Sequence, residues 1–566
     1  MTPPIQSRLL RRVAAAGFAG AVALSLTACA ESERDPAPEG GGAKVGGTMT
    51  FGAAGAPEMF DPFYATDGET FRVTRQIFDG LVTYKPGTAD LAPQLAESWE
   101  SSEDGLTWTF KLRSGVKFHD GTDFNAEAVC ANFTRMFSQT GAGQSESVTT
   151  YWIDNMGPGF SDGAKPALYK GCEAPDATTA VLTINRATSK MPNILGLPSF
   201  SMQSPKAMEE FKANNVQAAG DSFTYPAYAL EHPTGTGPFK FGKYDKANGT
   251  IELVRNEEYF DEAGKAKLDK LIFKIIPDET ARKQALKAGT IDGYDFPAPA
   301  DWDGLKSDGF NVQVRPPFNI FYVGITQQNN PALQDLRVRQ ALAHAINRDQ
   351  LVKSQLPEGA KVATQFIPDT VDGYNSSLQA LPYDVEKAKS LLAEAVPGGL
   401  TINFYWPSEV TRPYMPNPRD MFGAISADLE AAGVKINVVT KPWNGGYLDD
   451  VDEGRADLFL LGWTGDYNTA DNFINTFFGN PNNRFKTQAS PWGQELADAL
   501  KAADTEPDAE TRNKMYEQIN ADIMEKYLPA IPISHSPPAL VVTKDIQGLV
   551  PSPLTAEDFN TVSKNT

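Results

Sequence analysis

Apolar and polar positions alternate in several short stretches of the first half of the chain, which predicts strands, and apolar positions recur every three or four residues in others, which predicts helices. Helices are expected over residues 70–81 and 125–133, the second with Asn125 as its N-cap. The strands expected here are 46–51, 108–112 and 178–184, followed by a hairpin of 239–244 and 250–254.

From about residue 270 the predicted strands and helices alternate along the chain. Such alternation is typical of βαβ units on a mixed sheet, so the fold class is expected to be α/β. Two or three domains are expected for a chain of 566 residues. The predicted strands are 270–276, 400–405, 457–461, 531–534 and 539–542, and the predicted helices are 278–288, 335–346, 384–395, 419–432 and 510–527.

Composition narrows the class of partner. The content of 41% hydrophobic and 22% charged residues is that of an ordinary globular protein. The formal net charge of −20 repels phosphate backbones, which excludes nucleic acid as an expected partner.

The N-terminus has the pattern of an export signal. Three arginines among the first 12 residues precede an apolar stretch of small residues, 13–28, which is too short to serve as a stable membrane span. The stretch ends in Leu26-Thr-Ala-Cys29, which resembles a bacterial lipobox. We expect a lipoprotein signal peptide over 1–28, a lipid on Cys29 and a flexible tether over 29–45. The alternative is a plain secretory signal in which Cys29 is incidental.

Two cysteines remain among the three of the chain, Cys130 and Cys172. An even pair in an exported protein predicts a disulfide, and two free buried thiols are the alternative.

No pattern of catalytic or metal-binding residues stands out. The four histidines lack metal-ligand spacing, and no nucleophile elbow, phosphate-binding loop or dinucleotide fingerprint is present. Neighbouring carboxylates such as Asp449 and Asp450 are typical of a solvated face. We therefore expect no catalytic residue, metal or cofactor, and an exported hydrolase stays a distant alternative.

Several segments, taken in order, resemble the extracytoplasmic peptide-binding components of ABC importers, the dipeptide- and oligopeptide-binding branch of solute-binding family 5. They cover nearly the whole chain after the tether. The segments are Arg75-Gln-Ile-Phe-Asp-Gly-Leu81, residues 91–99, residues 104–122, Gly235-Thr-Gly-Pro-Phe239, residues 286–292 and residues 337–348.

The resemblance implies a two-lobed periplasmic-binding-protein-like fold with the ligand in the cleft between the lobes. Mixed sheets flanked by helices are expected, with an extra subdomain in the first lobe. With the Pro-rich stretches 296–301 and 528–533 as crossings, we expect lobe I over 46–296 with the subdomain at about 80–220, lobe II over 297–529, and a return to lobe I over 530–566.

The segment Gly462-Trp-Thr-Gly-Asp466 follows a buried strand and puts a carboxylate between two aromatic residues. The resemblance gives Asp466 the role of binding the ammonium of a peptide ligand, because a charge that enters a closed cleft needs an opposite charge. Glycines there would let the backbone approach the ligand. A loop capped by Asp466 is the alternative. Further contacts are expected from Trp463, Thr464, Gly465 and Tyr467.

Arg412, in Thr411-Arg-Pro-Tyr414, matches the arginine that binds the ligand carboxylate in the dipeptide branch of the family. An exposed loop arginine is the alternative, and Arg419 is a candidate to share the role. Weaker candidates for the cleft are Gly55 and Ala56 in the loop after the first strand, Tyr322 and Tyr447, and a position in the core or at the rim is the alternative for each.

The function expected from the resemblance is capture of di- or oligopeptides and delivery to a membrane permease powered by a cytoplasmic ATPase. The receptor is expected to be a monomer at the outer face of the bacterial cytoplasmic membrane, held by its lipid alone. A non-peptide solute such as a metal chelate, haem or a glutathione-like ligand is the alternative, since one fold serves many ligands.

Overall fold

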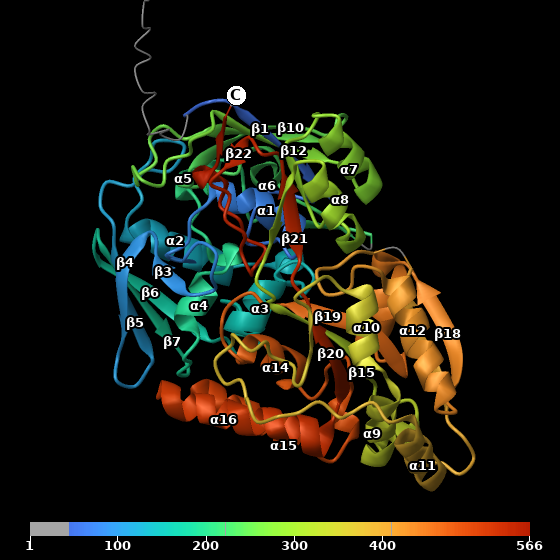
Figure 1. Ribbon diagram of the computed structural model, residues 1–566. Helices are drawn as coiled ribbons and strands as arrows, with labels where there is room; N and C mark the ends of the chain where they lie inside the picture. The colour runs from blue at the N-terminus through green and yellow to red at the C-terminus, as the bar shows by residue number, and fades with distance from the viewer. Residues whose placement is uncertain (1–44, 221, 409, 566) are drawn as a thin grey trace, which may run out of the picture. The chain divides into compact units, whose positions relative to one another are not determined.

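The computed structural model describes residues 45–220, 222–408 and 410–565 (Figure 1). The expected signal peptide, the lipid site Cys29 and the tether up to residue 44 lie outside the described residues. Three larger sheets organise the described part of the chain.

A seven-stranded mixed sheet is built largely from the first half of the chain. Strand β1 pairs in parallel with β12 and β13, whereas the other neighbours in the order β10-β11-β12-β1-β13-β21-β14 are antiparallel. The strands are β1 (Thr48–Ala53), β10 (Phe239–Asp245), β11 (Thr250–Arg255), β12 (Lys270–Ile275), β13 (Gly293–Asp295), β14 (Asn311–Val314) and β21 (Ala539–Val542).

Helix α1 (Gly68–Ile77) packs on this sheet and presents residues to the site described below. Its N-cap is Asp67, whose carboxylate accepts hydrogen bonds from the backbone N–H groups of Glu69 and Thr70. Val73 and Ile77 of the helix join the apolar cluster of the sheet, which contains Phe51 and Phe273. This packing fixes the orientation of α1 on the sheet and so sets the direction of the side chains that lie outside the cluster.

A second sheet of six strands belongs mainly to the later half of the chain, in the order β16-β20-β15-β19-β17-β18. Every residue of its central strand β15 is buried. Helices α9 to α12 and α14 lie around these strands (Figure 1). The strands are β15 (Asn319–Ile325), β16 (Lys361–Val362), β17 (Thr401–Pro407), β18 (Lys435–Lys441), β19 (Leu458–Thr464) and β20 (Ala530–His535).

The helices that accompany the second sheet are α9 (Leu336–Ala345), α10 (Arg348–Gln355), α11 (Val385–Ala395), α12 (Pro418–Ala431), α13 (Leu448–Asp452), α14 (Asp471–Phe478), α15 (Gly493–Thr505) and α16 (Ala509–Asp522).

A separate four-stranded antiparallel sheet lies within the range expected for the extra subdomain, in the order β4-β5-β7-β6. The structure joins Cys130 of α2 and Cys172 of β6 in a disulfide, as the sequence predicts. The elements of this region are β2 (Val82–Tyr84), β3 (Leu91–Pro93), β4 (Ala96–Ser101), β5 (Thr107–Leu112), α2 (Ala126–Phe137), α3 (Thr150–Met156), β6 (Tyr169–Asp176), β7 (Thr179–Ile184), α4 (Met191–Leu195), α5 (Pro205–Glu210), β8 (Gln217–Ala219), β9 (Ser222–Thr224) and α6 (Ala227–Glu231).

The chain passes between the seven- and six-stranded sheets twice, after β14 and again after β20. The two passages are hydrogen-bonded to each other, since Arg315 N donates to Pro538 O (2.8 Å) and the Asn319 side chain bonds the backbone of Ser536 in both directions. The guanidinium of Arg315 is fully buried between Asp295 and Glu557, each at 2.7 Å. The lobe limits that we expect from the sequence remain predictions.

The remaining elements are α7 (Glu279–Lys287) and α8 (Trp302–Ser307), and the short strands β22 (Ile546–Gln547) and β23 (Ser563–Lys564). No helix in the described ranges is long and apolar enough to span a membrane. Nor do the described residues bring three or more His, Cys, Asp or Glu side chains together as metal ligands.

Candidate functional site

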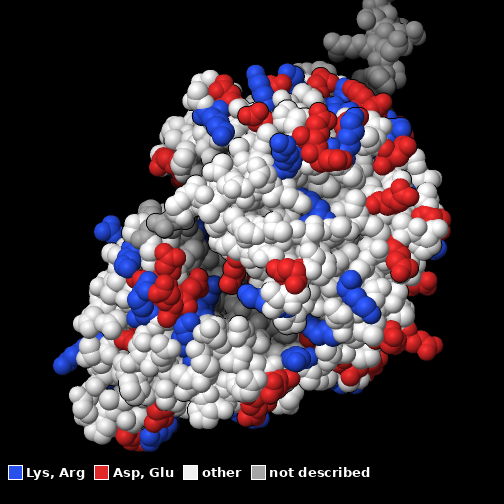
Figure 2. Space-filling model, turned by 180° about the vertical axis from the view of Figure 1, so that it is seen from behind, with Lys and Arg blue, Asp and Glu red and all other residues white. Residues whose placement is uncertain are grey.

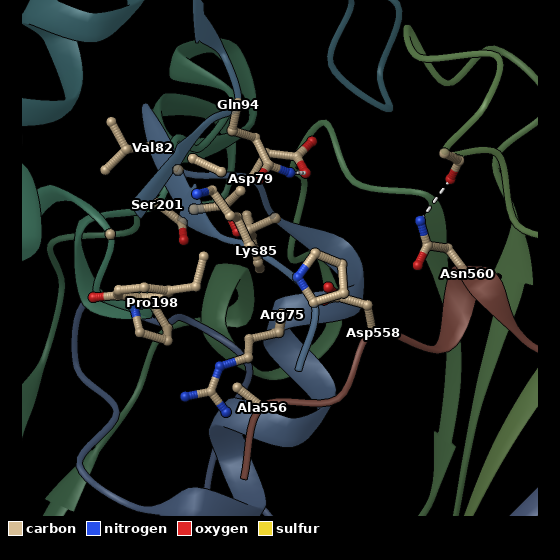
Figure 3. Close-up of a pocket in the computed structure, with 18 of the residues that line it drawn as sticks. Arg75, Asp79, Val82, Lys85, Gln94, Pro198, Ser201, Ala556, Asp558 and Asn560 are labelled. Atoms are coloured by element: carbon tan, nitrogen blue, oxygen red, sulfur yellow. Dashed lines mark hydrogen bonds between the residues drawn. The ribbon is translucent and has the colours of Figure 1, made fainter. Parts of the chain in front are cut away.

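The candidate site is a polar cavity with a volume of about 330 Å³, where three parts of the fold meet. Its lining includes Arg75 of α1, Tyr84 of β2, Tyr151 of α3, Asp466 after β19, and Asp558 near the C-terminus. Figure 3 shows Gln94 beside Asp79, and Arg75 beside Ala556, among the residues from separate chain segments that line this space. A cavity of this size is at the small end of the range for ligand pockets in proteins.

Asp466 lies in the loop that joins β19 to α14. Its backbone N–H donates to Oδ1 of Asn472 (2.7 Å), and the same oxygen accepts a hydrogen bond from the Trp463 indole (3.3 Å). Asn472 thereby fixes the loop on both sides of Gly465. Among the described residues, no basic side chain lies within 4.0 Å of the Asp466 carboxylate. Hydrogen bonds thus hold the loop in place, whereas the negative charge of Asp466 has no ion-pair partner.

Burial raises the pKa of the Asp466 carboxyl to about 6. The positive charge of Arg75 and hydrogen bonds from Asn472 and Tyr151 oppose this shift, whereas the negative charge of Asp154 adds to it. A carboxylate that is poorly solvated and lacks a close cation gains from a ligand ammonium, which would supply both charge and hydrogen bonds.

The other carboxylates that line the cavity differ in whether hydrogen-bond donors of the protein reach them. Asp79 is almost fully buried and accepts hydrogen bonds from Thr236 (2.7 Å), Tyr259 (3.2 Å) and Gln94. Asp558 is half-buried, and burial raises its pKa to about 6 against the influence of Arg75. The hydrogen bonds of Asp79 therefore link neighbouring segments of the cavity wall, whereas Asp466 and Asp558 face the open space of the cavity.

Arg75 is a basic residue of the cavity whose charge acts on both Asp466 and Asp558. It lies in the last turn of α1, half-buried, with its guanidinium carbon 5.6 Å from the centre of the Phe71 ring. Figure 3 shows its side chain extending from the helix beside Ala556. Arg75 belongs to the motif Arg75-Gln-Ile-Phe-Asp-Gly-Leu81, but its role could not be predicted from the sequence, because the acids around it come from distant segments of the chain.

The two glycines before Asp466 make room for protein side chains. A Cβ on Gly462 would lie 2.3 Å from the Ile320 carbonyl oxygen and 2.4 Å from the Tyr414 ring. A Cβ on Gly465 would lie 2.3 Å from the Phe318 ring. Packing against the six-stranded sheet thus requires glycine at both positions, and backbone contact with a ligand stays a prediction.

The aromatic neighbours of Asp466 are held by the protein itself. Trp463 is half-buried at the end of β19, and Thr464 pairs there with Asn319 of β15. Tyr467 is 3% exposed and donates its hydroxyl hydrogen to Asp471 (2.8 Å). Trp463, Thr464 and Tyr467 do not line the cavity that Asp466 faces, so their contact with a ligand stays a prediction.

Arg412 lies in a different cavity from Asp466. Its guanidinium stacks on the Trp443 ring at 4.3 Å, and its backbone forms a turn with Met415. Phe296, Pro538 and other residues near the passages between the sheets line this second cavity. Arg419 is exposed on the first turn of α12. The structure does not bring either arginine together with Asp466.

The weaker candidates occupy other environments. Tyr322 and Tyr447 are wholly buried: Tyr322 packs among Phe366, Phe477 and other rings, and Tyr447 donates to the Leu460 carbonyl oxygen (2.5 Å). Both side chains belong to the core in this structure, and their contact with a ligand stays a prediction. Gly55 lies against Glu69 of α1, and Ala56 is exposed.

Charge is mixed at the surface as well as in the cavity. Acidic and basic side chains alternate over the face seen in Figure 2, which is hollowed near its centre. None of the four histidines lines the cavity of Asp466. His119 is half-buried and His535 is buried, and a ring nitrogen of each lies within hydrogen-bond distance of a backbone carbonyl oxygen, Gly237 O and Asn319 O.

The chain matches known proteins over most of its length. The family model described as bacterial extracellular solute-binding proteins, family 5 middle, matches residues 90–485. A dipeptide-binding protein of Escherichia coli is 33% identical over 91% of this chain and 94% of its own, and a heme-binding protein A of Haemophilus influenzae is 33% identical over 96% and 97%.

Solved structures agree with these sequence matches. A dipeptide binding protein from Pseudoalteromonas sp. SM9913, in complex with Met-Leu, has a TM-score of 0.77 at 25% identity and covers 92% of this chain and all of its own. Such neighbours are two-lobed periplasmic binding proteins, which confirms the α/β, two-lobed fold class expected from the resemblance. Proteins of this kind are solute receptors that act outside the cytoplasm and are not enzymes. The chain therefore belongs to family 5 of the bacterial extracellular solute-binding proteins.

Proposed function

We propose that this protein is the lipid-anchored, substrate-binding component of an ABC importer and captures short peptides. It holds a di- or oligopeptide between its lobes and delivers it to a membrane permease driven by a cytoplasmic ATPase. The names of relatives such as the dipeptide-binding protein of Escherichia coli support the ligand class. The lipobox-like segment ending at Cys29 supports the anchor.

One observation carries the ligand class: a half-buried carboxylate in a polar cavity, held by Asn472 and without an ion-pair partner within 4.0 Å among the described residues. In our proposal the ammonium of the peptide binds Asp466. Tyr84 and Tyr151 flank the same space and supply an aromatic wall for the first side chain. When the peptide enters a closed cleft, its ammonium and the Asp466 carboxylate both lose their water, and the contact between the two groups replaces it.

The test compares free and N-acetylated forms of one peptide. A charge-assisted hydrogen bond contributes about 1.5–3 kcal/mol, which is about 10- to 150-fold in affinity. Asp466→Ala is expected to weaken binding of Met-Leu by such a factor and to leave the weak binding of N-acetyl-Met-Leu unchanged. Asp449→Ala, at an exposed carboxylate on α13, is the matched control and is expected to bind as wild type. An equal loss for both peptides would remove the ammonium-binding role.

A relative named heme-binding protein A makes haem the competing ligand. No histidine lines the cavity, so this chain offers no imidazole for a haem iron there. Native mass spectrometry of the purified protein distinguishes the two ligands. A set of short-peptide masses supports our proposal, whereas a single non-peptide mass would keep the receptor and replace its ligand.

A further inference from the structure

The buried arginines of this protein normally have partners, and they are of two kinds. Some pair with carboxylates: Arg72 with Glu69 and Asp295, Arg135 with Asp61 (2.5 Å), and Arg315 with Asp295 and Glu557. Others donate to backbone carbonyl oxygens: Arg282 to Ile276 and Pro277, and Arg339 to Leu333 and Tyr527. Both arrangements offset the cost of removing a guanidinium from water.

Arg75 is half-buried and belongs to neither kind. Within the described ranges, no carboxylate lies within 4.0 Å of its guanidinium and no carbonyl oxygen accepts a hydrogen bond from it; the guanidinium lies over the Phe71 ring. Burial lowers the pKa of Arg75 below its ordinary value even though Asp466, Glu557 and Asp558 act to raise it. In the case of Arg72, one turn earlier on the same helix, close carboxylates outweigh burial and the pKa is raised. Arg75 thus lacks the anion that Arg72 has.

The position of Arg75 indicates what would supply that anion. It lines the same cavity as Asp466, and the two charges act on each other without touching. A zwitterion placed between them would give the carboxylate an ammonium and the guanidinium a carboxylate. A guanidinium binds a carboxylate through two parallel hydrogen bonds, which fixes its position as well as its charge.

We propose that Arg75 binds the terminal carboxylate of a short peptide whose ammonium is held by Asp466. This inference rests on the proposed function and deepens it, because two charges in one small cavity limit the length of the peptide. A dipeptide is the shortest peptide that carries both charges. The site therefore selects dipeptides, and longer chains that keep their ammonium on Asp466 must direct their carboxylate elsewhere.

The competing account is that Arg75 only balances the charge of Asp466. The two accounts differ in what a C-terminal amide does. If Arg75 binds the ligand carboxylate, its loss weakens binding of the free acid and leaves binding of the amide unchanged. If Arg75 only balances the charge of Asp466, its loss changes binding of the free acid and of the amide equally, because both peptides carry the ammonium.

The experiment measures the affinities of Met-Leu and Met-Leu amide for four variants by calorimetry. Wild type is expected to prefer the free acid by about 10- to 150-fold. Arg75→Gln is expected to abolish this preference without changing the affinity for the amide, and Arg75→Lys to retain part of it. Arg113→Gln is the matched control: this cavity residue is already engaged with Gln94 O (2.5 Å) and Glu97, and its loss is expected to keep the preference.

Arg412→Gln is the fourth variant, because the family resemblance assigns binding of the ligand carboxylate to Arg412. Retention of the preference in Arg412→Gln supports the assignment to Arg75. The inference is overturned if Arg412→Gln abolishes the preference, or if Arg75→Gln keeps it or weakens both peptides equally. If wild type binds neither Met-Leu nor any other free dipeptide, the proposed function fails first, which is a separate result.

Discussion

Acidification of the binding assay tests the site most directly, because the free receptor holds Asp466 with a pKa of about 6. A peptide ammonium, with a pKa of about 8, stays protonated below pH 7, and a peptide carboxylate stays ionised above pH 4. Asp466 is about nine-tenths ionised at pH 7 and about one-tenth ionised at pH 5. Since only the ionised form attracts the ammonium, the affinity for Met-Leu is expected to fall about tenfold over this range.

The same linkage predicts a proton count. At pH 6 about half of the free receptor carries a proton on Asp466, and binding of the ammonium favours the ionised form. Binding at pH 6 is therefore expected to release about half a proton per peptide. Calorimetry in two buffers of different ionisation enthalpy measures this number.

Asp466→Asn is the control for this experiment, because Asp558 lines the same cavity and also has a pKa raised to about 6. The variant is expected to bind weakly with an affinity that no longer depends on pH between 5 and 7. If the pH dependence survives in Asp466→Asn, another carboxylate is responsible. If wild type shows neither the tenfold loss nor the proton release, the reasoning about Asp466 is refuted.

Three further predictions concern stability. The disulfide of Cys130 and Cys172 closes a loop with a sequence separation of 42, so replacing both with Ser is expected to lower the unfolding free energy by about 4 kcal/mol in urea titration. Burial raises the pKa of Asp79 to about 6 from 3.8, so native Asp79 holds its proton more tightly than the unfolded chain does. Wild type should thus lose about 1.4 kcal/mol between pH 5 and pH 8 that Asp79→Asn does not lose; equal pH dependence would contradict this. Gly465→Ala is expected to cost about 1–3 kcal/mol, seen as a lower Tm, because its Cβ would meet the Phe318 ring; an unchanged Tm would count against the packing argument.

Local chemistry decided which elements the sequence could predict. The helices capped by Asn125 and Asp278 begin where expected, because each cap side chain accepts a hydrogen bond from a backbone N–H three residues later. The hairpin of β10 and β11 also follows from its turn residues. The place of β21 between β13 and β14 was not predictable, since it depends on contacts between distant parts of the chain.

The same distinction holds for the site. The sequence singled out Asp466, because a carboxylate after a buried strand leaves the core. It gave no role to Arg75, whose meaning depends on acids contributed by other segments. The burial of Tyr322 could not be predicted from the sequence, because every residue of β15 is buried and a tyrosine in such a strand cannot be distinguished by pattern from one at a cavity wall.

The two passages between the sheets have a consequence for how this protein can be divided. Residues between β14 and β21 form a closed excursion, which leaves the seven-stranded sheet at Arg315 and returns at Pro538, where the two chain segments are hydrogen-bonded to each other. The six-stranded part is thus, in topology, an insertion into the seven-stranded part with adjacent ends. Val314 and Ala539 are paired neighbours in the seven-stranded sheet, so a short linker between them would remove the insertion as one block and leave the order of that sheet intact.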